Sequence, residues 1–122
     1  MILALAVALA GGVGAVARYV VDGLVQDRVF GPFPWGTTVV NVTGSLVLGF
    51  LTGLAWYHGA PARLDAVLGT GLCGGLTTWS TASWETVRLV ESGLHRQAMA
   101  YGVGALAVAL LAAGAGMGLA SL

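Results

Sequence analysis

Charged residues divide this chain into four long stretches that carry no charge. Each stretch has room for a helix of about 20 residues, the length needed to cross roughly 30 Å of bilayer hydrocarbon. The uncharged stretches are Met1–Ala17, Val29–Ala62, Ala66–Trp84 and Gln97–Leu122. The pattern predicts an all-α membrane protein that forms a single domain, 1–122, with transmembrane helices at about 2–25, 35–57, 64–90 and 97–119.

The second predicted helix carries one polar stripe. Thr38, Asn41, Ser45, Gly49 and Thr52 recur at intervals of three or four residues, so they share one face of the helix. An unpaired asparagine amide in hydrocarbon costs several kcal/mol, so Asn41 is expected to face either a partner helix or a hydrated path. The polar neighbours on the same face favour the path.

The middle of the third predicted helix is poor in helix-forming residues. Gly71, Gly74 and Gly75 are followed by Thr77 and Thr78, and this run predicts a break in the helix. Carbonyl groups freed at such a break are hard oxygen ligands that suit a cation, or they bond neighbouring hydroxyls.

Hydroxyl groups and indole rings follow the predicted break. Aromatic rings are positive at their edges, so ring edges, hydroxyls and the amide hydrogens of Asn41 together suit a small, strongly hydrated anion. The hydroxyls are those of Thr77, Ser80, Thr81 and Ser83, and the rings are those of Trp79 and Trp84.

Charged side chains lie near the predicted helix ends. Arg18 is expected to snorkel to the headgroups, to pair with Asp22 one turn further on, or to line an electropositive vestibule. Glu85 and Arg88 are spaced for a surface pair where the third helix reaches water. The fourth helix has almost no polar residues and is expected to serve in packing.

Composition agrees with a membrane protein and excludes several function classes. The chain is 57% hydrophobic and 8% charged, whereas soluble domains are about a quarter charged. Its net charge is zero and it has no lysine, so a nucleic-acid partner is not expected. It offers no nucleophile–base pair or metal-ligand cluster, and we expect no enzyme.

The four predicted helices make a thin bundle that cannot easily enclose a watery path alone, so an oligomer is expected. Arg28, Arg88 and Arg96 lie on one predicted side of the membrane and Arg63 on the other. So small a difference permits insertion in both orientations, which in turn permits an antiparallel dimer.

Three segments, in this order, resemble the Fluc/CrcB family of fluoride channels. They are Gly11–Tyr19, Pro34–Gly49 and Gly74–Glu85, and the resemblance covers essentially the whole chain. It implies an antiparallel, dual-topology dimer in a prokaryotic cell membrane, with two pores that passively export cytoplasmic fluoride and a central structural sodium ion.

The resemblance also implies roles for individual residues. Asn41 becomes the pore amide and Arg18 the vestibule arginine, and the backbone carbonyls of Gly74 and Thr77 from both subunits hold the sodium. The expected fluoride pathway comprises Asn41, Ser80, Thr81, Trp79, Thr38 and Ser45.

This chain departs from the family pattern at two positions after the break. The family usually has phenylalanine where this chain has Trp79 and Ala82, and the last helix has no serine before Ser121. Either Trp79 or Trp84 replaces the missing ring, or the chain is one subunit of a heterodimer with a homologous partner rather than of a homodimer.

Two other function classes are open to a four-helix membrane protein of this size. A small multidrug transporter with proton-coupled exchange needs a carboxylate within the membrane, and the first helix offers only Asp22 near its end. A non-conducting assembly subunit leaves the polar stripe and the predicted break without a purpose.

Overall fold

The computed structural model describes all 122 residues, and every regular element in it is a helix. Three helices are long and apolar enough to cross a membrane: α1 (Ile2–Gln26), α2 (Trp35–His58) and α6 (His95–Leu119). Between α2 and α6, the chain forms a bent helix from Ala62 to Glu91. The predictions of an all-α, multi-pass membrane protein and of an interrupted third helix are confirmed.

The bent helix is built from four pieces. It begins with α3 (Ala62–Leu64), the π-helix η1 (Asp65–Cys73) and α4 (Gly74–Leu76), and it resumes after two extended residues as α5 (Trp79–Glu91). The extended residues are Thr77, with ψ of 158°, and Thr78, with φ of −150° and ψ of 123°.

The break falls within the run of residues that predicted it, at the end of that run. The glycines of the run remain helical, and the two threonines that follow them are extended. Threonine is branched at Cβ, which favours extended backbone. Thr78 then begins α5, because its hydroxyl accepts a hydrogen bond of 3.2 Å from the backbone N–H of Thr81.

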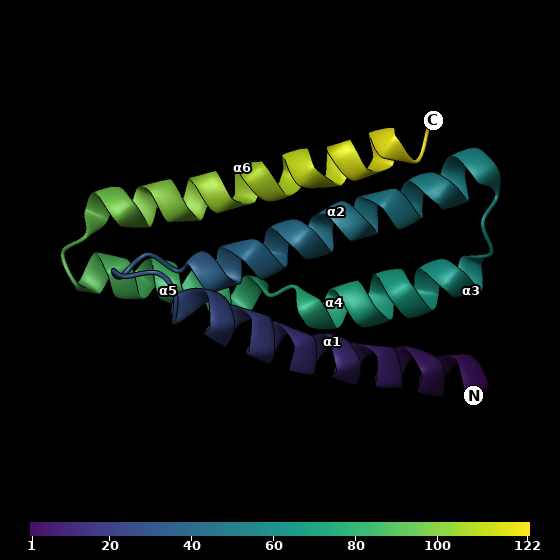
Figure 1. Cartoon of the computed structure of the whole chain (residues 1–122), viewed down its shortest axis with the longest axis horizontal. Helices are drawn as coiled ribbons and strands as arrows, with labels where there is room; N and C mark the ends of the chain where they lie inside the picture. Colours follow the sequence, from purple (N-terminus) through teal and green to yellow (C-terminus); the bar gives the residue numbers. More distant parts are fainter.

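The helices lie roughly side by side, with α6 and α1 on the outside (Figure 1). α2 packs mainly against α6, while α1 packs mainly against η1 and α4. The break between α4 and α5 lies near the middle of the molecule, and both termini lie at the end where α2 turns into α3. The break is therefore placed at mid-depth of the bundle, far from both ends.

Glycines bring the backbones of these helices close together. A Cβ on Gly14 of α1 would collide with the carbonyl oxygen of Leu72 in η1, and one on Gly116 of α6 would collide with the carbonyl oxygen of Leu46 in α2. Small residues at such crossings are typical of membrane bundles, where close packing replaces the hydrophobic effect.

Most apolar side chains point away from the chain's own interior. Only 18 of the 122 residues are buried, although more than half are hydrophobic. A small buried cluster joins α5 to α6 through Leu89, Ala98 and Tyr101. An apolar exterior of this extent matches a protein whose surroundings are lipid.

Candidate functional site

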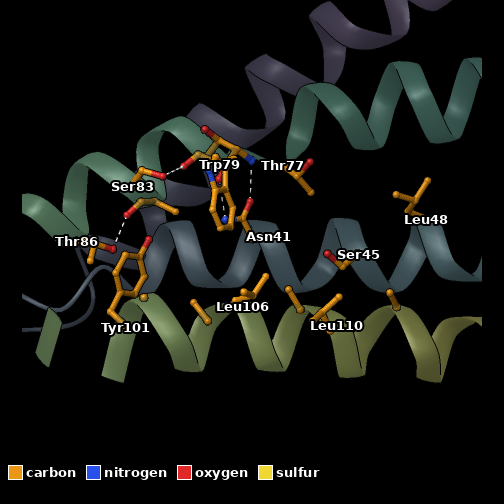
Figure 2. A pocket seen from close by; sticks show the side chains of 16 residues that line it. Asn41, Ser45, Leu48, Thr77, Trp79, Ser83, Thr86, Tyr101, Leu106 and Leu110 are labelled. Carbon is orange, nitrogen blue, oxygen red and sulfur yellow. Dashed lines mark hydrogen bonds between the residues drawn. The ribbon is translucent and has the colours of Figure 1, made fainter. Parts of the chain in front are cut away.

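An open cavity of about 630 Å³ lies between α2, the break, α5 and α6 (Figure 2). Its two sides differ in chemistry. The polar groups come from α2, the break and α5: Asn41, Ser45, Thr77, Thr78, Ser83 and Thr86. Apart from Tyr101, α6 contributes only glycine, alanine and leucine, and no aspartate, glutamate, arginine or lysine lines the cavity.

Asn41 closes the break by pairing with Thr78. Its Nδ2 donates to the Thr78 carbonyl at 2.9 Å, and its Oδ1 accepts from the Thr78 N–H at 2.7 Å. The side chain replaces backbone hydrogen bonds that the broken helix cannot make, which is essential where water is scarce. An amide carries two N–H donors, so one donor of Asn41 stays available to the cavity.

Two carbonyls at the break lose the donors that a continuous helix would supply. The Thr78 N–H donates to Asn41 and not to the Gly74 carbonyl four residues earlier. The Thr81 N–H donates to the Thr78 hydroxyl and not to the Thr77 carbonyl. Such neutral oxygens, freed from helical bonds, fit a monovalent cation, which takes carbonyl oxygens in place of its hydration shell.

Arg18 reaches the break from α1. Its Nη1 donates to the Thr77 carbonyl at 3.2 Å, and this is the only hydrogen bond that the guanidinium makes within the chain. The predicted alternative of a pair with Asp22 is wrong, because the bond goes to the break. The side chain is half-buried and places a permanent positive charge beside the opened backbone.

The expected pathway residues divide into two groups. Asn41, Ser45 and Trp79 line the cavity, as Figure 2 shows. The Ser45 hydroxyl makes no hydrogen bond within the chain and is free to donate into the cavity. Trp79 is 70% exposed, so most of its ring is not covered by other residues of the chain.

The other three expected pathway residues lie outside the cavity lining. Thr38 donates to the Pro34 carbonyl at 2.9 Å. The hydroxyls of Ser80 and Thr81 contact the hydroxyl of Thr78, at 3.4 and 3.0 Å. The structure therefore gathers the hydroxyls of Ser80 and Thr81 at the break, around the hydroxyl of Thr78.

The two tryptophans of α5 have different surroundings. Trp79 lines the cavity, whereas Trp84 stacks with Arg88, whose guanidinium carbon lies 5.5 Å from the ring centroid. Ala82 lines the cavity and packs against the cluster that contains Tyr101. Within one chain, Trp79 and Tyr101 are therefore the rings that reach the cavity, and Trp84 is not.

A half-buried carboxylate, that of Glu85, joins three helices beside the cavity. Thr37 of α2 donates to Glu85 Oε1 at 3.0 Å, and the Tyr101 hydroxyl of α6 donates to Glu85 Oε2 at 2.7 Å. Thr37 and Tyr101 are each only 1% exposed. The expected pair of Glu85 with Arg88 forms no hydrogen bond: Glu85 accepts from Thr37 and Tyr101, and Arg88 stacks on Trp84.

Sequence reasoning missed this network because its members are distant along the chain. The usable signal was a single tyrosine in an otherwise apolar helix, since a buried tyrosine hydroxyl needs a partner. Glu85 also lines a smaller polar cleft of about 330 Å³ with Asp22, Gln26 and Arg88, whereas its partner Tyr101 lines the main cavity.

Comparison with known proteins finds a matching family and several similar proteins. Residues 5–117 match the family described as CrcB-like protein, Camphor Resistance (CrcB). A relative from Leifsonia xyli subsp. xyli, named Fluoride-specific ion channel FluC 1, is 54% identical over 99% of this chain and 88% of its own length. A FluC 1 of Streptomyces avermitilis is 53% identical over 86% of this chain and 85% of its own length. A Cutibacterium acnes protein named Fluoride-specific ion channel FluC 2 is 46% identical over 94% of each chain.

Proposed function

The chain belongs to the CrcB family, and we propose on that premise that it is a fluoride-selective channel that passively exports fluoride across the cell membrane of a prokaryote. The observation that carries the proposal is the cavity at the break. Its polar wall consists of hydroxyl and amide groups, and no carboxylate faces into it to repel an anion. Fluoride needs such donors because it loses hydration when it enters a narrow path.

Three groups are placed to interact with a passing fluoride ion. The free N–H of Asn41 and the unpaired hydroxyl of Ser45 are neutral donors on the same wall. Arg18 raises the electrostatic potential around the break and attracts anions to it. The edge of the Trp79 ring adds a weaker positive contact.

We propose that the working unit is an antiparallel dimer with dual topology. A single chain leaves the cavity open, and its α6 side offers few groups that an ion can bind. A second subunit closes the cavity and supplies further lining. The sparse polar groups of α6 favour a heterodimer with a homologous subunit over a homodimer.

We also propose a structural sodium ion at the break. The carbonyl oxygens of Gly74 and Thr77 from both subunits would hold it, since both lack helical donors. A bound sodium supplies a fixed positive charge beside the anion path. Arg18, Asn41 and the hydroxyl of Thr78 hold the surrounding backbone in its extended form.

A proton-coupled transporter is the weaker alternative. It requires a carboxylate that faces the transport cavity, but Glu85 is held by two side chains and Asp22 lies in the small polar cleft. A non-conducting subunit has no need for a free hydroxyl and amide hydrogen on a cavity wall.

The deciding experiment measures fluoride efflux from liposomes that contain only this chain, with a fluoride electrode. Passive flux of fluoride with little chloride flux supports the channel. Chloride flux equal to fluoride flux contradicts fluoride selectivity. If flux appears only when a homologous subunit is added, the heterodimer is supported.

A further inference from the structure

We infer that Arg18 is a positioning residue that sets how tightly the break binds a cation, because it occupies the Thr77 carbonyl that the cation needs. The inference rests on the proposed sodium site. It adds a competitor for sodium at that site. When no sodium is bound, a side chain of α1 donates a hydrogen bond to the Thr77 carbonyl.

The polar groups of the two extended residues are held by different kinds of partner. Thr78 pairs through its N–H and its carbonyl with the neutral amide of Asn41. The Thr77 carbonyl has lost its helical donor and accepts from Arg18 at 3.2 Å. Thr77 therefore offers the one carbonyl of the break for which a charged side chain and a metal ion compete.

The contact is specific to Arg18. It joins residues that are 59 positions apart, and no other arginine of the chain makes a hydrogen bond to backbone or side chain through its guanidinium. The group keeps its charge at all relevant pH values. No carboxylate accepts a hydrogen bond from it, so its full charge acts on the carbonyl.

A cation that binds the Thr77 carbonyl must share that oxygen with the guanidinium or displace it. Sharing places two positive charges a few ångströms apart in a medium of low dielectric constant, and displacement breaks a charged hydrogen bond. Both effects weaken sodium binding. A coupling of ordinary size for two ligands corresponds to about tenfold in affinity.

The test uses the full chain in detergent micelles and follows thermal unfolding by tryptophan fluorescence as sodium replaces N-methylglucamine at constant ionic strength. Three variants are compared with the parent chain. Arg18→Gln removes the charge at the break, Arg18→Lys keeps it, and Arg63→Gln removes a charge from the exposed start of α3.

Without sodium, Arg18→Gln should unfold at a lower temperature than the parent, because the Thr77 carbonyl has lost its donor. Sodium should restore its stability, with a midpoint about tenfold lower in sodium concentration than that of the parent. Arg18→Lys and Arg63→Gln should keep the parent's midpoint. This pattern supports competition at one oxygen.

The inference is overturned if Arg18→Gln has the parent's sodium midpoint, or if Arg63→Gln shifts the midpoint equally. It is also overturned if saturating sodium fails to restore a destabilised or unfolded Arg18→Gln, since sodium should replace the lost donor. If sodium stabilises neither the parent nor Arg18→Gln, the sodium site itself is wrong. Fluoride efflux measured in parallel on the parent tests the channel independently of these outcomes.

Discussion

Asn41 holds Thr78 by both its N–H and its carbonyl, at 2.7 and 2.9 Å, so one side chain of α2 takes the place of a stretch of helix. The same side chain lines the cavity and keeps one donor free. Support of the break and contact with the anion are thus combined in a single residue, and substitutions must separate the two roles.

Asn41→Ala should reduce both stability and fluoride flux. It leaves the Thr78 N–H and carbonyl unpaired, and each unsatisfied group costs about 1–3 kcal/mol. Thermal unfolding and liposome efflux measure the two effects. Asn41→Asp keeps the acceptor for the Thr78 N–H but replaces the amide donors with a carboxylate that repels an anion, so it should lose flux at least as fully as Asn41→Ala. An unchanged melting temperature for Asn41→Ala would contradict the supporting role.

Ser45→Ala should reduce flux and leave stability nearly unchanged. The Ser45 hydroxyl faces the cavity and makes no hydrogen bond within the chain, so its loss should change stability by less than about 0.5 kcal/mol. Loss of one hydrogen bond to the ion, worth about 1.4 kcal/mol, should slow efflux about tenfold. Flux equal to that of the parent would remove Ser45 from the pathway.

Tyr101→Phe should destabilise the chain by about 1–3 kcal/mol, because Glu85 Oε2 loses its only side-chain donor in a half-buried site. Denaturation in micelles measures the loss. Tyr57→Phe is the control, since the Tyr57 side chain is 51% exposed and its hydroxyl makes no hydrogen bond within the chain. Equal effects of the two substitutions would argue against the buried network.

Gly14→Ala should destabilise the bundle by about 1–3 kcal/mol, because the added methyl group collides with the Leu72 carbonyl and forces α1 away from η1. Gly12→Ala provides a control on the same helix, where an added Cβ meets no atom within 4 Å. That substitution should be neutral or stabilising, since alanine favours helix. The melting temperatures of the two variants test this: a Gly14→Ala variant that melts no lower than Gly12→Ala would contradict the close contact of α1 with η1.

Trp79→Ala should lower fluoride flux, whereas Trp84→Ala should leave it close to the parent value. The Trp79 ring lines the cavity, and the Trp84 ring stacks with Arg88 outside the lining. Efflux from liposomes that contain equal amounts of each variant makes the comparison. A larger loss in Trp84→Ala than in Trp79→Ala would show that the rings are placed differently in the working assembly.

The apolar helices and the interruption of the third one were predictable from the sequence. Charged side chains are costly in hydrocarbon, so they accumulate at the ends of membrane spans and mark them. A run of glycines and threonines in the middle of a span lowers its helix propensity, and this effect does not depend on which helices pack against the span. The choice of Thr77 and Thr78 over the glycines was not predictable, because the glycines stay helical where α4 packs closely against α1.

The sequence by itself therefore determined the three apolar spans, the polar stripe of α2 and the presence of a break, since each depends on the solvation or backbone preference of neighbouring residues. Only the tertiary structure decided which partners those polar groups find. Asn41 meets Thr78 across 37 positions, Arg18 meets Thr77 across 59 and Thr37 meets Glu85 across 48. A hydrogen bond needs atoms within about 3 Å, and such distances depend on how closely and at which register the helices pack.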